Sequence, residues 1–161
     1  MRTLHLLRHA KSDWDDPDLP DEERPLNGRG KRDARALAKH LARHPIPLDA
    51  VFCSTALRAR KTLEAITPSL GGARLAEEPD LYGAADDELL GFIRGLPAEL
   101  GAVMLVGHNP GLEELARALV PEGRAFPTCT LATITFKADK WSAVGAGKGR
   151  LAAFLTPADF A

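Results

Sequence analysis

Two arginines and two histidines lie close behind short apolar segments of this 161-residue chain, and their types suit chemistry on a phosphoryl group. Arg8 and His9 follow the first apolar segment. Arg58 comes shortly after the second, and His108 follows the third. A guanidinium group matches phosphate oxygens two at a time, and an imidazole nitrogen can attack phosphorus, which divides one difficult displacement into two easier ones. The combination predicts a site that binds a phosphoryl group and forms a covalent bond to it.

Five short segments have the pattern of β-strands. Residues 3–7, 49–53 and 102–106 are compact apolar runs of the length found in buried parallel strands. Residues 131–136 alternate threonine with apolar side chains, and residues 151–155 form a last apolar run after a glycine-rich stretch. This pattern predicts that the last two segments pair as a hairpin or as edge strands.

Helical periods of apolar residues separate these segments: residues 34–41, 57–69, 88–94 and 112–119. Asn109 and Pro110 precede the last period, and we expect Asn109 to cap this helix with Pro110 at its first position. Strands that alternate with helices are typical of an α/β domain with a mainly parallel sheet. We therefore expect one such domain to extend over residues 1–161.

The residues that could do chemistry come together if the first three strands are parallel neighbours. Ligands of open α/β sheets bind in the crevice outside the carboxyl ends of the strands, where Arg8, His9 and His108 would stand. Arg58 would join them from the first turn of the next helix, and the N-terminus of the helix after His108 would favour negative charge. The chain has no G-x-x-x-x-G-K-[ST] loop and no evident carboxylate cluster for magnesium, so we expect neither a cofactor nor a metal.

The composition argues against several classes of protein. The chain is 45% hydrophobic and 27% charged, with a formal net charge of −1. Such a balance argues against a nucleic-acid-binding or membrane-surface protein that relies on bulk charge. No apolar run approaches the ~20 residues that cross a bilayer, and the apolar segment before Arg8 is too short for a signal peptide. We expect a soluble, cytoplasmic protein.

Four short motifs resemble those of a known family and occur in its order: Leu7-Arg8-His9-Ala10-Lys11-Ser12, Arg24-Pro25-Leu26-Asn27, Ser54-x-x-x-Arg58-Ala59-x-x-Thr62 and Gly107-His108. The family is the histidine phosphatase superfamily, and the chain resembles more narrowly its short SixA-type phosphohistidine phosphatases. The resemblance implies a three-layer α/β/α sandwich of the phosphoglycerate mutase-like type. Its sheet would be mostly parallel with an antiparallel edge.

The resemblance also implies roles for the residues at the strand ends. His9 would be the nucleophile and would form a phosphohistidine intermediate. Arg8, Arg58 and His108 would hold the phosphoryl group without a metal. The family usually has glycine where this chain has Ala10, and alanine adopts positive φ less readily, so we expect a slightly different loop rather than an inactive site.

Further side chains are candidates for the same site. Ser12, Asn27 and Thr62 would add neutral contacts to the phosphoryl group. Larger members of the family use a carboxylic acid to protonate the leaving group, and Asp80 and Glu78 are the candidates in this chain. A phosphorylated imidazole leaves far more readily than an alkoxide, so the lack of a clear acid favours phosphoramidate substrates over alcohol phosphates. Among these substrates, the resemblance to SixA-type enzymes implies a histidine-phosphorylated protein.

Three other functions fit these residues. A phosphatase of small phosphomonoesters would use the same site with Asp80 or Glu78 as the acid. A non-catalytic module would bind phosphate or a phosphoprotein, with Ala10 as the mark of lost activity. Metal-dependent hydrolysis would use histidines as ligands, but the pair His40 and His44 has no evident third ligand, and zinc requires three or four. We interpret that pair as part of a solvated helix face.

Overall fold

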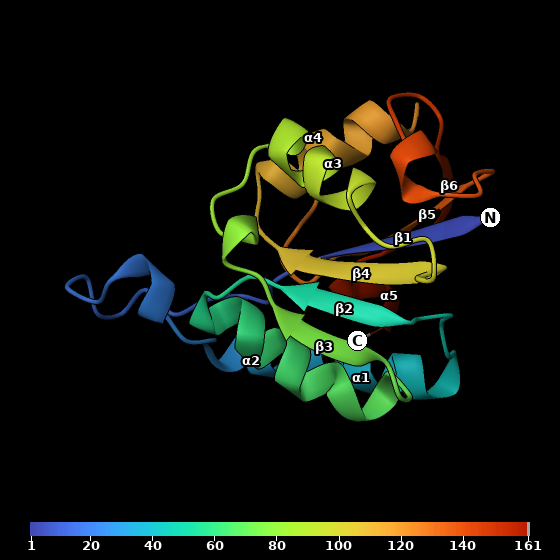
Figure 1. Ribbon diagram of the computed structural model, residues 1–161. Helices are drawn as coiled ribbons and strands as arrows, with labels where there is room; N and C mark the ends of the chain where they lie inside the picture. Colours follow the sequence, from blue (N-terminus) through green and yellow to red (C-terminus); the bar gives the residue numbers. More distant parts are fainter. Residues whose placement is uncertain (161) are drawn as a thin grey trace.

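The computed structural model describes residues 1–160, which form a six-stranded sheet with helices on both faces (Figure 1). The strands are β1 (Arg2–Arg8), β2 (Ala50–Cys53), β3 (Arg74–Glu77), β4 (Ala102–Gly107), β5 (Leu131–Phe136) and β6 (Arg150–Leu155). The α-helices are α1 (Gly28–Arg43), α2 (Leu57–Ile66), α3 (Asp86–Arg94), α4 (Gly111–Leu119) and α5 (Pro157–Phe160). Short 3-10 helices are η1 (Asp21–Glu23), η2 (Thr67–Ser69), η3 (Pro79–Leu81) and η4 (Trp141–Ala143). None of the helices in this part of the chain has the length and hydrophobicity that a membrane span requires.

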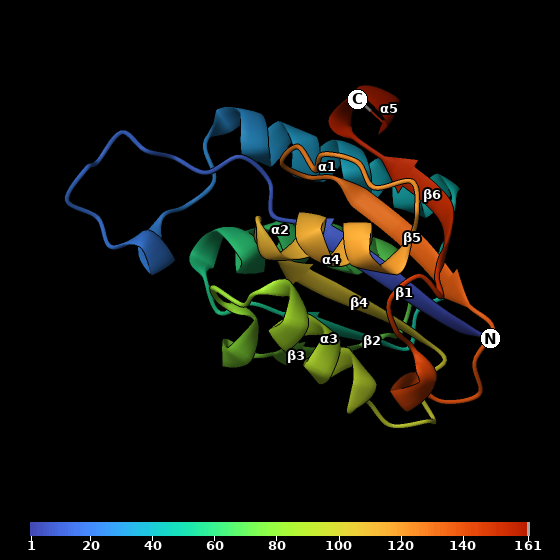
Figure 2. The same ribbon diagram turned by 90° about the horizontal axis from the view of Figure 1, so that it is seen from above.

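The sheet has the strand order β3-β2-β4-β1-β5-β6. The first four of these strands are parallel, whereas β5 is antiparallel to β1 and pairs in turn with the antiparallel β6. Helices α1, α2 and α5 cover one face of the sheet, and α3 and α4 cover the other (Figures 1 and 2). The predicted three-layer α/β fold, with its mostly parallel sheet and antiparallel edge pair, is confirmed.

Two hydrophobic cores lie on the two faces of the sheet. The alternation of side chains along β1 sends Leu4 and Leu6 into the core beneath α3 and α4, and Leu7 into the core beneath α1 and α2. All residues of β4 are buried, because this strand lies between β1 and β2 and helices cover both of its faces. Because β1 and β4 are parallel neighbours in register, with Arg8 opposite Gly107, their carboxyl ends lie side by side.

The edge strand β3 is absent from the predicted elements. All four of its residues are exposed, so the burial of apolar side chains left no signal in the sequence. The strand exists because its backbone pairs with β2 from Arg74 to Glu77.

The start of α4 also differs from the prediction. The helix begins at Gly111 with Pro110 in the N-cap position, so the prediction that Asn109 caps it is wrong. The side-chain amide of Asn109 instead donates to the carbonyl oxygen of Phe126, at 3.0 Å. This hydrogen bond holds the side chain toward the loop at Phe126, and its buried Oδ1 accepts no hydrogen bond from the helix or from any other residue within 1–160.

The segment between β1 and α1 projects beyond the carboxyl edge of the sheet (Figures 1 and 2). Its two ends are held together, because Ser12 and Leu26 form an isolated antiparallel bridge and the N–H of Asn27 donates to the carbonyl of Lys11 at 3.0 Å. A Cβ atom on Gly30 would lie 2.1 Å from the same carbonyl oxygen. The first turn of α1 can therefore approach the end of β1 only because residue 30 is glycine.

Candidate active site

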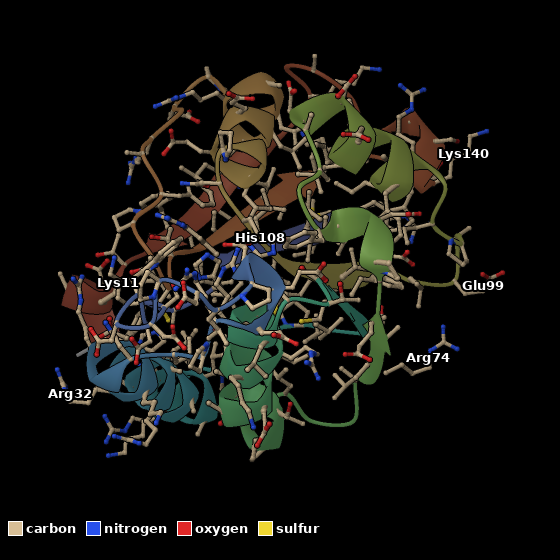
Figure 3. All side chains as sticks on the ribbon, turned by 90° about the vertical axis from the view of Figure 1, so that its left-hand side faces the viewer. Lys11, Arg32, Arg74, Glu99, His108 and Lys140 are labelled. Atoms are coloured by element: carbon tan, nitrogen blue, oxygen red, sulfur yellow. The ribbon has the colours of Figure 1, made fainter. Side chains whose placement is uncertain are left out.

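The four residues at the predicted strand ends lie together at the carboxyl edge of the sheet. Arg8 ends β1, His9 follows it, Arg58 lies in the first turn of α2, and His108 follows β4. Figure 3 looks onto this edge, with His108 near the centre and nitrogen-rich side chains beside it. The four side chains line a cavity of about 310 Å³. The rest of its lining consists of Lys11, Ser12, Trp14, Asn109 and Thr128.

His9 is buried and held in one tautomer. Its Nδ1 atom lies 2.7 Å from the carbonyl oxygen of Ala10, so Nδ1 carries the proton and Nε2 carries the lone pair. The Nε–H of Arg58 donates to this Nε2 at 3.4 Å. Burial, followed by the positive charges nearby, lowers the pKa of His9 to about 3. At neutral pH the ring is therefore uncharged, with its nucleophilic nitrogen beside a guanidinium.

His108 is also uncharged, and it shares the guanidinium of Arg58. Its Nδ1 atom lies 3.4 Å from Nη2 of Arg58, which can only donate, so Nδ1 accepts and Nε2–H donates to the hydroxyl of Ser54 at 2.7 Å. Burial and then the charge of Arg58 lower the pKa of His108 to about 4. The ring centroids of His9 and His108 are 5.2 Å apart.

The guanidinium of Arg58 also contacts the loop that projects from the sheet. It donates to the backbone carbonyl of Asp21 at 2.7 Å and to the Asp21 carboxylate at 3.0 Å. The hydroxyl of Tyr82 donates to the same carboxylate oxygen at 2.6 Å, and the Tyr82 ring packs edge-on against His108. The hydrogen bond from Tyr82 contributes most to a lowered pKa of Asp21, and the hydrogen bond from Arg58 lowers this pKa further. The Asp21 carboxylate is therefore ionised at neutral pH. Asp21 thus balances the charge of Arg58 in the free protein.

Arg8 has a donor without a partner. Its Nη1 donates to the carbonyl oxygen of Phe126 at 2.7 Å, whereas its buried Nε has no hydrogen-bond partner among residues 1–160. Buried donors in folded proteins almost always have an acceptor. Arg8 itself lines the cavity, where its positive charge favours the binding of an anion.

The turn after β1 is fixed from two sides. The N–H of Ala10 donates to the fully buried hydroxyl of Thr62 at 2.9 Å, and this hydroxyl donates to the carbonyl of Arg58 at 2.8 Å. The N–H of His9 donates to the carbonyl of Gly107 at 3.1 Å. Thr62 therefore connects the turn that carries His9 to the helix that carries Arg58.

Ala10 fits this turn without backbone strain. It is fully buried, and Cys129 is the only residue other than glycine with a positive φ within the described range of the chain. The position therefore does not require the conformational freedom of glycine.

The remaining predicted site residues have different positions. Ser12 lines the cavity, whereas Thr62 lies behind it with its hydroxyl in the hydrogen bonds just described. Asn27 is not among the lining residues, and its side-chain oxygen caps α1. Asp80 and Glu78 are also outside the lining, and the Glu78 carboxylate accepts from the N–H of Asp80 at 3.4 Å.

Three residues at the site were not singled out from the sequence. Asp21 is one of several acids in its loop, and nothing in the local pattern distinguishes it. Tyr82 follows the acidic stretch that contains the candidate acids, and it is the only tyrosine of the chain, a signal that could have drawn attention to it. Trp14 is an aromatic residue in an otherwise polar segment, which is a comparable signal.

A larger cavity, of about 510 Å³, lies between α1 and α5. Basic side chains line it together with His40 and His44, whose ring centroids are 4.7 Å apart. Within residues 1–160 no group of three His, Cys, Asp or Glu side chains is placed to hold a metal ion. Nucleophilic chemistry is better served by the smaller cavity, where buried, uncharged imidazoles lie beside cations.

Comparisons with known proteins identify the family to which this chain belongs. Residues 4–84 match the family model of the histidine phosphatase superfamily, branch 1. An uncharacterised protein of Mycobacterium tuberculosis is 36% identical over 162 residues, which cover 94% of this chain and 99% of that protein. Structures from Nakamurella multipartitia and Agrobacterium tumefaciens, both provisionally described as the phosphohistidine phosphatase SixA, each show 31% identity and a TM-score of 0.84. They match 97% of this chain and 96% and 98% of their own chains. The chain therefore belongs to the histidine phosphatase superfamily, in its SixA-type group, and is a hydrolase.

Proposed function

We propose that this hydrolase is a protein phosphohistidine phosphatase that works through a phosphoryl-enzyme intermediate on His9 and needs no metal. One observation carries the proposal: the uncharged ring of His9 is held by its Nδ1–H, and its Nε2 lone pair lies beside the guanidinium of Arg58. The similarity to structures described as phosphohistidine phosphatases supports the same class of substrate.

In the first step, the Nε2 lone pair of His9 attacks phosphorus. The bond from phosphorus to the imidazole nitrogen of the substrate breaks, and its electron pair stays on that nitrogen. The other ring nitrogen of the substrate carries a proton, so the group that leaves is a neutral imidazole. The His9 ring becomes positively charged, and its Nδ1–H remains hydrogen-bonded to the carbonyl of Ala10. The guanidiniums of Arg8 and Arg58 neutralise the charge on the phosphoryl oxygens in the transition state.

In the second step, water attacks phosphorus from the side that the leaving group has vacated. The bond from phosphorus to Nε2 breaks, and its electron pair returns to His9 as the lone pair. One proton of the water remains on the new hydroxyl of inorganic phosphate, and the other passes to a phosphate oxygen. The enzyme is then restored to its uncharged resting state.

The state of the acidic groups supports a substrate with a phosphorus–nitrogen bond. Asp21 is ionised in the free protein, and its hydrogen bond raises the pKa of Tyr82, so neither is a ready proton donor. An alkoxide leaving group needs such a donor, whereas a phosphorylated imidazole needs it far less. The site is therefore better suited to phosphohistidine than to an alkyl phosphate.

The test is phosphate release in excess EDTA from a phosphohistidine protein, from p-nitrophenyl phosphate and from glycerol phosphate. We expect the fastest release from the protein and the slowest from the alkyl ester. Faster hydrolysis of the alkyl ester would contradict the substrate class. Inhibition by EDTA would contradict independence from metal.

The same substrates test the nucleophile. His9→Ala should release no phosphate from any of them while its circular dichroism spectrum stays that of the wild type. A His9→Ala variant that still turns over would exclude the phosphoryl-enzyme mechanism.

A further inference from the structure

Trp14 lies at the cavity with most of its surface exposed to water. Among the large apolar side chains of residues 1–160, only Met1, Trp14 and Leu75 are exposed, and Trp14 is 60% exposed. It lines the same cavity as His9 and Arg58. An indole ring has a large apolar surface, and an exposed one beside a binding site is suited to contact with a ligand.

The ring of Trp14 is nevertheless fixed in place. The guanidinium of Arg24, a residue that is only 6% exposed, lies over the ring with its carbon 3.9 Å from the ring centroid. The indole N–H donates to the hydroxyl of Ser12 at 2.9 Å, and Arg24 itself donates to the carbonyl of Asp16 at 3.0 Å. A binding surface that is already ordered loses little conformational entropy when a ligand arrives.

The attachment of Trp14 leaves one face of its ring available. Arg24 covers the other face, so the exposed surface of the indole lies on the free face and on the ring edges. A planar ring could stack on this free face, and a positively charged imidazolium would gain a cation–π attraction in addition.

The direction of the reaction places the leaving group toward the cavity mouth. Phosphoryl transfer requires the attacking and leaving atoms to lie roughly in line on opposite sides of phosphorus. The attacking Nε2 of His9 lies at the buried wall, since His9 is 7% exposed. The leaving group therefore departs toward solvent, where Trp14 is the most exposed aromatic side chain of the lining.

We propose that Trp14 is a specificity-determining residue that stacks against the imidazole ring of the phosphohistidine substrate. This inference rests on the proposed function and adds to it a means of selecting ring-bearing phosphoramidates. It predicts that Trp14 acts on the leaving group rather than on the phosphoryl group.

The experiment compares two substrates that share the phosphorus–nitrogen bond. Free phosphohistidine has an imidazole leaving group, whereas phosphoramidate releases ammonia and has no ring. Trp14→Ala should lower kcat/KM for phosphohistidine by about three- to tenfold, which corresponds to the usual stabilisation that one aromatic pair provides. It should change kcat/KM for phosphoramidate by less than about twofold, because Arg8, Arg58 and His108, the charged and imidazole groups of the site, are unchanged.

Two variants serve as controls. Trp14→Phe keeps a ring and should restore most of the preference for phosphohistidine. Leu75→Ala removes another exposed apolar side chain, which is 47% exposed on the edge strand β3. This variant should leave kcat/KM unchanged for both substrates. Thermal unfolding of each variant shows whether the fold is retained.

Each other outcome has a distinct meaning. Equal losses on both substrates would show that Trp14 only holds the loop that carries Asp21 and would overturn the inference. A loss on a phosphohistidine protein but not on free phosphohistidine would overturn it in favour of an apolar contact with the protein surface. If the wild type hydrolyses neither phosphohistidine nor phosphoramidate, the proposed function itself fails.

Discussion

At the residue scale, the guanidinium of Arg58 is the most heavily shared group of the site. It donates to His9, to His108 and to Asp21, and Arg58 as a whole residue is 8% exposed. The two imidazoles suit catalysis because they are neutral, but the Asp21 carboxylate occupies a donor that a phosphoryl oxygen could use. Asp21 therefore stabilises Arg58 in the free protein and competes with an anionic ligand for it.

Asp21→Asn should tighten the binding of inorganic phosphate as a competitive inhibitor. The change removes a negative charge from the Arg58 guanidinium, and because the Asp21 side chain is 45% exposed the effect should be modest. We expect an inhibition constant about two- to fivefold lower, or ~0.5–1 kcal/mol. Asp18→Asn, at an exposed acid of the same loop, makes the same change in net charge and should have little effect. Equal effects of the two variants would mean that long-range charge, rather than contact with Arg58, governs binding.

At the element scale, the reaction depends on how the end of β1 is held against its neighbours. The hydroxyl of Thr62 on α2 accepts from the N–H of Ala10, and α1 approaches the backbone of Lys11 through Gly30. Both contacts join a helix to the turn that carries His9, so each offers a separate test of how that turn is positioned.

Thr62→Val should lower stability and activity together. Valine has a similar shape but leaves the buried N–H of Ala10 without an acceptor, which costs about 1–3 kcal/mol. Urea unfolding measures the stability, and phosphate release measures the position of His9. Thr67→Val is the matched control. The Thr67 hydroxyl donates to the carbonyl of Leu63 within the same helical segment, so it does not hold the turn that carries His9. Equal losses of stability in the two valine variants, with equal activities, would show that Thr62 does not position the turn that carries His9.

Gly30→Ala should destabilise the protein although alanine is a better helix former. The new Cβ would meet the carbonyl oxygen of Lys11, and forcing an atom into such a space costs about 1–3 kcal/mol. Gly91→Ala, in the interior of α3, places its new Cβ in open space beside the helix, and the variant should instead gain roughly 0.5–1 kcal/mol. Opposite shifts of the urea midpoint are expected, and shifts of the same sign would contradict a steric cause at residue 30.

The elements that could be predicted from the sequence are those that bury apolar side chains. Strands β1, β2 and β4 follow from compact apolar runs because helices cover both faces of the sheet there. Strand β3 could not be predicted, because its exposed residues leave no periodic pattern and its pairing with β2 is a long-range property of the backbone. The cap of α4 was missed for a related reason: Asn109 takes its partner from a loop that is distant in the chain.

At the scale of the whole molecule, the site combines residues whose position can be predicted from the sequence with residues whose position cannot. His9, Arg58 and His108 come from strand ends or the helix that follows one, so the parallel sheet places them at one edge and the sequence reveals them. Asp21 and Tyr82 come from loops whose meeting depends on tertiary packing, and single-sequence patterns do not encode which acid of a loop reaches a distant arginine.

The burial of three uncharged histidines makes the stability of the whole fold depend on pH. Burial lowers the pKa of His5, and it is the main reason why the pKa is about 3 for His9 and about 4 for His108. Below about pH 6.5 the unfolded chain binds protons that the folded chain excludes, so the free energy of unfolding must fall as the pH falls toward about 4.

The slope of this dependence is open to measurement. Each histidine that is protonated only in the unfolded chain contributes about 1.4 kcal/mol per pH unit, and ordinary carboxylates begin to titrate only near the lower end of this range. Urea unfolding at intervals from about pH 7 to about pH 4.5 should show stability declining below about pH 6.5. His108→Asn removes one such proton, so the decline in its stability should be shallower. A wild-type stability that stayed flat over this range would mean that these imidazoles take up protons in the folded protein as readily as in the unfolded chain, and it would contradict the lowered pKa values of His9 and His108.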